Sequence, residues 1–219
     1  NPDAMNNLAL CYYDEVGVKK DVNKSVLLFT KAVEFGNSDA MNNLAYCYIN
    51  GEGIEKDIKR AISLYEKAIA LDNSSAMCNL AHCYNKGINV KKDINRAILL
   101  YIKAVKLDNS TAMNNLALCY EKDGYGYKKD INKAIELYEK AIKLDSNNKI
   151  FHENLQSLIK EYPSEYIVYC QLQIITINSK HDILLKEYQE LKDNLINYAP
   201  NTTNTTELEK AFYLKANKL

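Results

Sequence analysis

Apolar side chains recur with helical spacing through roughly the first two-thirds of the chain. Met, Leu and Tyr stand at positions i, i+3 and i+7, and the same triplet returns every 36 residues. Residues with that spacing share one face of an α-helix. The triplets therefore predict a first helix in each of four successive units, roughly over residues 4–13 and the equivalent ranges. They are Met5, Leu8 and Tyr12; Met41, Leu44 and Tyr48; Met77, Leu80 and Tyr84; and Met113, Leu116 and Tyr120.

A second apolar stripe follows each first helix, after a loop that contains glycine. In the second unit this stripe is Ile62, Tyr65 and Ile69, whose spacing of three and four is again helical. An aspartate stands just ahead of each stripe and predicts the N-cap of a second helix. The four aspartates are Asp21, Asp57, Asp93 and Asp130.

Small residues recur at fixed positions of both predicted helices, as expected where two helices approach closely. On the first helix they are Ala9, Ala45, Ala81 and Ala117. Neither helix of a unit can bury its apolar face alone, so we expect stacked units that share one continuous core. The pattern predicts an all-α fold, a right-handed α/α superhelical solenoid of helix pairs.

The repeat pattern divides the chain into three parts. Residues 1–146 hold four repeats, with boundaries near 1–36, 37–72, 73–108 and 109–146. Residues 147–200 are predicted to form a divergent helical cap, and residues 201–219 a polar linker with a short terminal helix. Atypical terminal units usually cover the last apolar face of a solenoid.

Within this predicted cap, the pattern favours three helices. One runs from Phe151 to Tyr162, keeps Leu155 at the leucine position of the repeat and is ended by Pro163. The segment 166–178 is rich in Ile, Tyr and Val, which also suits a strand, but its isoleucines have helical spacing and we favour a helix. Residues 181–198 are predicted to form the third helix.

The repeat carries a recognisable motif. In the second repeat it reads Ala-x-x-x-Leu-Ala-x-x-Tyr from Ala40 to Tyr48, then a glycine-containing loop, Asp57, and Arg-Ala-Ile-x-Leu-Tyr-x-Lys-Ala from Arg60 to Ala68. This motif resembles the Sel-1-like repeat family, a relative of the tetratricopeptide repeat. The period of 36 residues, with its longer loop between helices, favours the Sel-1-like form over the roughly 34-residue tetratricopeptide. The chain departs from the family where second helices end, because the expected glycine is present only as Gly36.

The resemblance implies a non-enzymatic adaptor or scaffold, whose concave face, lined by the first helices, binds a protein or peptide. By the same resemblance, the candidate contact residues lie on the first-helix stripe that turns away from the Leu and Tyr packing edge. They are Asn6, Asn7, Leu10, Tyr13, Asp39, Asn42, Asn43, Tyr46, Ile49, Asn79, His82, Asn85, Asn114, Asn115 and Leu118.

One position of that stripe changes freely between repeats, whereas the packing positions barely change. It reads Leu10, Tyr46, His82 and Leu118. Such variation is expected of a surface that recognises a partner, and it is also expected of a solvated face that drifts. Both interpretations stay open.

Another position of the stripe is identical in all four repeats: Asn7, Asn43, Asn79 and Asn115. A row of amides could hydrogen-bond the backbone of an extended peptide, or each amide could satisfy the backbone of a neighbouring repeat. The sequence does not decide between these roles. The first role predicts that replacing Asn43 and Tyr46 by Ala abolishes partner binding and leaves thermal stability almost unchanged.

Composition narrows the classes of partner. Lys and Arg together number 28 and balance 28 Asp and Glu, which gives no general attraction to nucleic acid or anionic lipid. No run of about 18 apolar residues predicts a membrane helix. We therefore expect neither nucleic acid nor membrane as a partner, and the oligomeric state is open. The abundance of Asn, Lys, Ile and Tyr is typical of an AT-rich genome, such as that of a large DNA virus or a protist. The sequence opens without Met, which leaves a removed leader open.

Four of the six cysteines, Cys11, Cys47, Cys83 and Cys119, are spaced 36 residues apart. Equivalent residues of stacked helices lie about 9–10 Å apart, whereas a disulfide needs Cα atoms within about 7 Å. We therefore expect small buried side chains rather than bridges or metal ligands. A reducing, intracellular setting, the cytoplasm, fits this cysteine usage best.

No motif for catalysis, phosphate binding or a closed metal site occurs in the sequence. Cys78 and His82 are four residues apart and could share a helix face, but two ligands do not make a closed zinc site. We expect no enzymatic activity and no cofactor. Two alternatives stay open: a self-assembling structural component and, less favoured, a small-molecule-binding or enzymatic member of the family.

Overall fold

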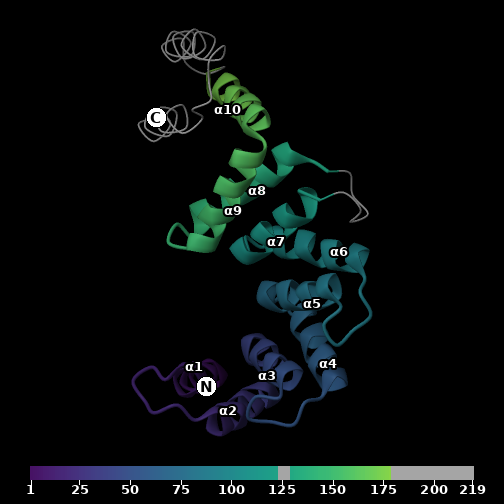
Figure 1. Ribbon diagram of the computed structural model, residues 1–219. Coiled ribbons are helices and arrows are strands. Elements are labelled where there is room, and N and C mark those ends of the chain that lie inside the picture. The colour runs from purple at the N-terminus through teal and green to yellow at the C-terminus, as the bar shows by residue number, and fades with distance from the viewer. Residues whose placement is uncertain (123–128, 179–219) are drawn as a thin grey trace. The chain divides into compact units, whose positions relative to one another are not determined.

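The computed structural model describes residues 1–122 and 129–178, with the backbone alone at residue 172 and over 174–178. The chain forms two compact units, Asn1–Tyr166 and Ile167–Leu219. The described ranges contain ten helices and no strand (Figure 1). These are α1 (Pro2–Asp14), α2 (Val22–Glu34), α3 (Ser38–Asn50), α4 (Ile58–Ile69), α5 (Ser74–Lys86), α6 (Ile94–Val105), α7 (Ser110–Tyr120), α8 (Ile131–Leu144), α9 (Lys149–Glu161) and α10 (Pro163–Asn178).

The predicted aspartate caps of the second helices are confirmed. The Asp57 carboxylate accepts a hydrogen bond from the backbone N–H of Arg60, with the oxygen 3.0 Å from the nitrogen. Asp21, Asp93 and Asp130 cap α2, α6 and α8 in the same way. Each bond satisfies a backbone N–H that has no partner inside the helix, and such a cap contributes about 1 kcal/mol.

The first helices of repeats two to four are capped by asparagine, and each cap also reaches the preceding repeat. The Asn73 side-chain oxygen accepts from the Ala76 N–H at 2.8 Å, while its Nδ2 atom donates to Asp39 at 2.7 Å. Asn37 and Asn109 bridge back in the same manner, to Asp3 and Ser74. An aspartate could accept the first bond but could not donate the second. Because the caps stand further upstream than the apolar pattern, these helices begin two residues earlier than predicted.

Small residues allow the helices of the first unit to pack closely. Ala9, Ala45, Ala81 and Ala117 are all 0% exposed. In the first repeat the serine at the contact, Ser25, is also fully buried, and its hydroxyl donates to the Ala9 carbonyl at 2.8 Å. Leu44, Leu80 and Leu116 are only 3–4% exposed and each follows another repeat, whereas Leu8 of the first repeat is 44% exposed. The leucine position is therefore buried by the repeat before it.

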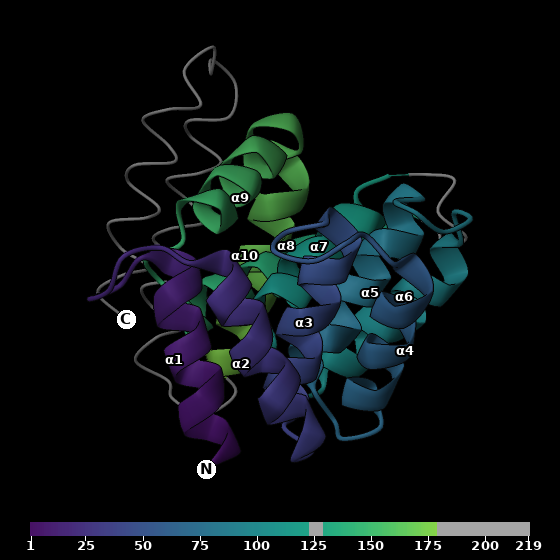
Figure 2. The same ribbon diagram turned by 90° about the horizontal axis from the view of Figure 1, so that it is seen from below.

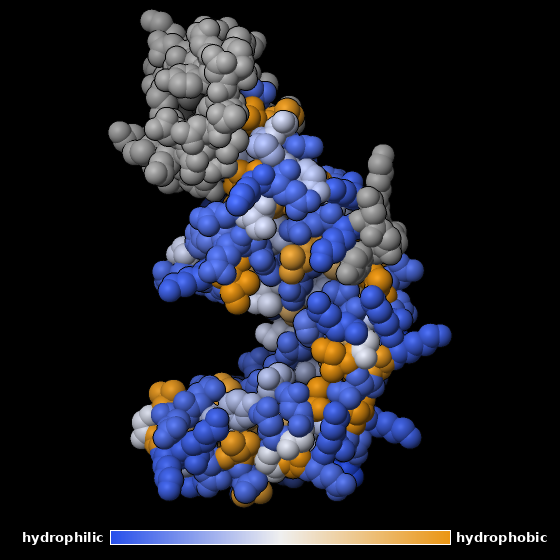
Figure 3. Space-filling model, in the orientation of Figure 1, coloured by the Kyte–Doolittle hydropathy of each residue, from blue (hydrophilic) through white to orange (hydrophobic). Residues whose placement is uncertain are grey.

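The two helices of each repeat pack against each other, and successive repeats pack against one another. The first helices α1, α3, α5 and α7 follow one another along one side, and α2, α4 and α6 follow one another along the other (Figures 1 and 2). The surface is hollowed on the side of the first helices (Figure 3). The all-α solenoid of helix pairs predicted from the sequence is confirmed.

Two of the helices predicted after the fourth repeat lie within the described residues. Helix α9 covers Lys149–Glu161, close to the predicted 151–162, and packs against α8. Pro163 is the first residue of α10, where its missing N–H breaks no helical bond. The ambiguous segment 166–178 is helical. The helices predicted for 181–198 and for the chain end lie outside the described residues.

Candidate functional site

The stripe predicted to face a partner contains both exposed and buried side chains. At its variable position, Tyr46 is 45% exposed, His82 is exposed, and Leu10 and Leu118 are half-buried. Asp39 is exposed but already accepts the bond from the Asn73 amide described above. Asn7 is exposed as well, so the open part of the stripe comprises Asn7, Asp39, Tyr46 and His82.

Other residues of the stripe are buried between repeats. Asn6, Asn42 and Asn114 are 5–9% exposed, and Ile49 is 6% exposed. The Tyr13 hydroxyl, at the same register as Ile49, donates to Glu52 in the following repeat. Residues at these registers therefore face the next repeat rather than solvent.

Three of the four identical asparagines, Asn43, Asn79 and Asn115, take part in a hydrogen-bonded row between repeats, here named the asparagine ladder. Asn43 Nδ2 donates to Asn6 Oδ1 at 3.0 Å, and Asn79 Nδ2 donates to Asn42 Oδ1 at 2.9 Å. The structural interpretation expected each asparagine to bond the backbone of a neighbouring repeat. The acceptor is instead a side chain of the preceding repeat. The ladder consists of the donors Asn43, Asn79, Asn115 and Asn154 and the acceptors Asn6, Asn42, Cys78 and Asn114.

Two members of the ladder were not predicted. Asn154 of α9 donates to Asn114 Oδ1 at 2.8 Å, which continues the ladder beyond the fourth repeat. The Asn154-Leu155 pair repeats Asn43-Leu44 in sequence, and that pair was the available signal. At the other member, Cys78 replaces asparagine, and Asn115 Nδ2 lies 3.7 Å from its Sγ atom. Sulfur is a weak acceptor, so this is the weakest rung.

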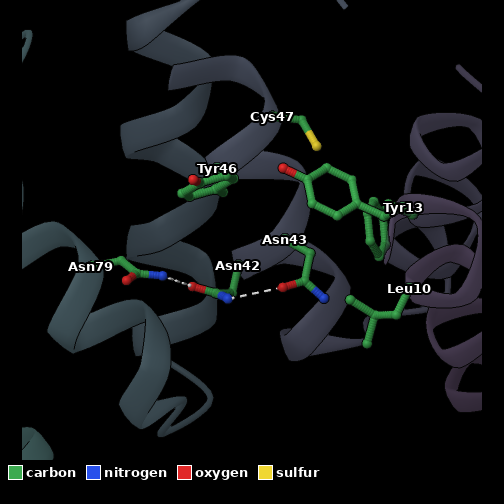
Figure 4. Close-up of a pocket in the computed structure, with 8 residues that line it drawn as sticks. Leu10, Tyr13, Asn42, Asn43, Tyr46, Cys47 and Asn79 are labelled. Carbon is green, nitrogen blue, oxygen red and sulfur yellow. Dashed lines mark hydrogen bonds between the residues drawn. The ribbon is translucent and has the colours of Figure 1, made fainter. Parts of the chain in front are cut away.

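A pocket of about 110 Å³ opens between the first and second repeats (Figure 4). Asn42 and Asn43 are joined across its base, with Asn42 Nδ2 donating to Asn43 Oδ1 at 3.1 Å, and the exposed Tyr46 ring lies at its side (Figure 4). The lining residues are Leu10, Tyr13, Phe29, Asn42, Asn43, Tyr46, Cys47 and Asn79. The structure therefore brings six of the fifteen predicted contact residues together at one place.

Two tyrosine–carboxylate pairs lie on the same side of the repeats. Burial and the bond to Glu52 raise the pKa of Tyr13. In the fourth repeat the fully buried Tyr138 donates to Glu121. Burial raises the pKa of Glu121, with the Glu161 charge adding to the effect, while the bond from Tyr138 and the Lys122 charge oppose it. Sequence reasoning missed both pairs, since their partners are 39 and 17 residues apart and carry no local pattern.

The Sel1 repeat family model matches residues 2–37, 38–73, 74–109 and 110–146, about two-thirds of the 219 residues. The chain belongs to the Sel1 repeat family. Sel1 repeat proteins generally mediate protein–protein interactions, and the fold is generally a non-catalytic scaffold.

Two solved structures place the fold among Sel1 repeat proteins. A Sel1 repeat protein from Oxalobacter formigenes is 29% identical with a TM-score of 0.56, over 66% of this chain and 57% of its own. The c5321 protein, a protective antigen present in uropathogenic Escherichia coli strains, displays a Sel1-like repeat fold; it is 22% identical with a TM-score of 0.65, over 84% of this chain and 39% of its own. The chain thus spans less than two-thirds of either relative. No curated protein matches it.

Each Sel1 repeat is also held together by a cation over an aromatic ring. The tyrosine late in the first helix lies under a Lys or Arg early in the second, a favourable contact of about 0.5–1 kcal/mol where exposed. The distances from cation to ring centre are 4.2 Å for Lys24 over Tyr12, 5.9 Å for Arg60 over Tyr48, 4.9 Å for Arg96 over Tyr84 and 5.0 Å for Lys133 over Tyr120. These contacts lie within repeats, whereas the asparagine ladder lies between them.

Burial and nearby charges shift the pKa values of further groups in these Sel1 repeats. Burial raises the pKa of the Cys78 thiol to about 11, which leaves it protonated. His82 is exposed, and partial burial with the nearby Lys86 charge lowers its pKa. No group of three or more His, Cys, Asp or Glu side chains that could hold a metal occurs in the described residues. Within the same residues, no helix is long and apolar enough to cross a bilayer.

Aromatic side chains of the second helices are buried inside the repeats. Phe29, Tyr65, Tyr101 and Tyr138 occupy one register and are 0–1% exposed. Burial raises the pKa of Tyr101, opposed by a polar interaction with Asn85, yet its hydroxyl makes no well-formed hydrogen bond within the described part of the chain. Asn85, one of the predicted contact residues, is half-buried and lies near this hydroxyl.

Proposed function

We propose that this Sel1 repeat chain is a non-enzymatic adaptor that binds a protein or peptide on the side lined by its first helices. The observation that carries the proposal is the contrast between neighbouring positions of one stripe. Asn6, Asn42 and Asn114 are buried and repeat, whereas Tyr46 and His82 are exposed and vary. At the buried position only Cys78 departs from asparagine, whereas the exposed position carries different chemistry in these two repeats, as a partner-recognising surface requires.

The asparagine ladder supports this role indirectly. It fixes the first helices relative to each other through side chains that are themselves buried or half-buried. The exposed Tyr46 beside the pocket is thereby held on a rigid frame, which lowers the entropy lost when a partner binds. Tyrosine is also enriched among residues that dominate binding energy at interfaces. Tyr46 is accordingly the principal contact residue of the proposal.

We expect the adaptor to work in a compartment where its own cysteine thiols stay reduced. Cys47 and Cys83 are buried and lie one per repeat, which fits a reducing compartment such as the cytoplasm. The balanced charge of the chain fits a protein or peptide partner better than a nucleic acid.

The test compares two variants of exposed apolar residues on opposite sides of the repeats. Peptides are selected from a random phage-displayed library on the intact protein, and their affinities are measured for Tyr46→Ala and Leu99→Ala. Leu99 is 58% exposed on α6, away from the first helices, and is the matched control. We expect Tyr46→Ala to weaken binding about tenfold or more and Leu99→Ala to leave it unchanged.

If the selected peptides bind both variants with the same affinity as the unaltered protein, the interaction lies on another surface and the proposal is refuted. The asparagines are unsuitable for this test. Removing Asn43 also breaks the bond to Asn6, so the double replacement of Asn43 and Tyr46 is now expected to lower stability.

A further inference from the structure

The pocket between the first two repeats has a chemical character that narrows the partner. None of its eight lining residues carries a charge. Leu10, Phe29 and the Tyr46 ring supply apolar walls, and Asn42, Asn43 and Asn79 supply carboxamides. Its volume of about 110 Å³ is smaller than the cavity of about 150 Å³ that holds a benzene molecule. An anchoring side chain of moderate size fits this volume.

The carboxamides of the pocket are only partly used by the protein itself. A primary amide has two N–H groups and an oxygen with two lone pairs. The ladder takes one N–H from Asn43 and one from Asn79, and the bond across the base takes one from Asn42. One N–H of each amide is left over in a site where Asn42 is only 9% exposed. A purely aliphatic anchor would bury these groups without partners, at about 1–3 kcal/mol each.

Charged anchors are disfavoured for a related reason. A carboxylate or ammonium entering the pocket would lose hydration with no opposite charge among the lining residues. The Glu52 carboxylate, held by the Tyr13 hydroxyl, adds repulsion against an acidic side chain, and it is not among the lining residues that an ammonium in the pocket would contact. A carboxamide both donates and accepts, and its methylene groups can pack on Leu10 and the Tyr46 ring.

We infer that the pocket accepts a glutamine side chain of an extended partner peptide. This inference rests on the proposed function and adds to it the chemistry of the anchoring residue. Glutamine and glutamate have nearly the same shape, so the pocket separates them by charge and hydrogen bonding alone. The first two Sel1 repeats therefore set the specificity for the partner.

The experiment uses the selected peptides and a pocket-filling variant. Each peptide is remade with its glutamine changed to glutamate, and both forms are titrated against the unaltered protein, Leu10→Phe and Leu118→Phe. Leu118 occupies the register of Leu10 in the fourth repeat, is half-buried as Leu10 is, and does not line the pocket, so it is the matched control. Circular dichroism of each variant checks that the helices remain.

We expect the glutamate form to bind the unaltered protein and Leu118→Phe about tenfold or more weakly, and Leu10→Phe to lose this preference. Peptides that depend on Tyr46 yet tolerate glutamate, or bind Leu10→Phe with the same preference, would overturn the inference and leave the adaptor proposal standing. If no selected peptide depends on Tyr46, both the adaptor proposal and the inference fall.

Discussion

The Nδ2 atom of Asn154 lies 2.8 Å from Oδ1 of Asn114, which joins α9 to the fourth repeat by the same bond that joins the repeats to each other. Helix α9 lies beyond the last residue matched by the Sel1 family model, 146. Its Phe151, Leu155 and Leu158 are nevertheless buried to the same degree as the repeat core. By these contacts, α9 occupies the place of a first helix after the fourth repeat.

Removing this bond should destabilise the end of the solenoid. Asn154→Ala leaves the Asn114 oxygen, in a side chain 5% exposed, without its donor, and we expect a loss of about 1–2 kcal/mol. Urea unfolding followed by circular dichroism measures it. The exposed Gln156→Ala on the same helix is the control, and equal midpoints for the two variants would contradict a role for the ladder here.

The weakest rung should be improvable by restoring the residue used elsewhere. Cys78→Asn gives Asn115 a true acceptor at a site where Asn42 and Asn114 are equally buried, and we expect a gain of about 0.5–1 kcal/mol. The reciprocal change, Asn42→Cys, should lower the free energy of unfolding by a similar amount. A destabilised Cys78→Asn protein would show that the third repeat cannot hold the amide.

The ends of the second helices hold a backbone conformation that suits glycine. Gly36 has φ 79°, and at the same register Asp72 and Asp108 have φ 56° and 54°. Left-handed backbone costs non-glycine residues about 1–2 kcal/mol, partly offset because aspartate tolerates it. We expect Asp72→Gly to raise the unfolding free energy by about 0.5–1 kcal/mol and Gly36→Asp to lower it. Gly36 has open space around its Cα, so the second change tests backbone strain alone; unchanged thermal midpoints in both variants would refute this account.

Glu121 should make stability depend on pH in a specific direction. Its pKa is raised above the ordinary value of 4.5, chiefly by burial, so the folded state holds the proton more tightly than the unfolded state. The stability gained from this tighter proton binding is fully present at pH values below the ordinary pKa. It is lost as pH rises through the raised pKa of the folded state. Glu121→Gln should therefore raise the unfolding midpoint near pH 7, by roughly a few tenths of a kcal/mol, and the gain should vanish near about pH 4.

Denaturation series at several pH values, with the exposed Glu66→Gln as control, measure this effect. Glutamine retains an oxygen for the Tyr138 hydroxyl, so the variant removes the charge without removing the acceptor. A gain that is the same at all pH values would assign the effect to packing instead.

The helices whose positions depend on periodicity and capping could be predicted from the sequence. The Met, Leu and Tyr triplets gave the first helices, and Asp57 with its equivalents gave the starts of the second helices, because these signals lie within one turn of the chain. The burial of Asn42 was not foreseen, since asparagine is mostly exposed and its partner Asn79 stands in the next repeat. The Tyr13–Glu52 bond was equally out of reach, because it depends on how far one repeat is rotated on the next.

The cysteines that recur once per repeat can report when neighbouring repeats separate. Cys47, Cys83 and Cys119 are only 1–6% exposed, and burial raises the pKa of Cys47 and Cys119 to about 11. A protonated, enclosed thiol reacts slowly with an alkylating reagent until the surrounding helices separate. The order in which these three sulfurs are modified would therefore report the order in which neighbouring repeats open, without any engineered label.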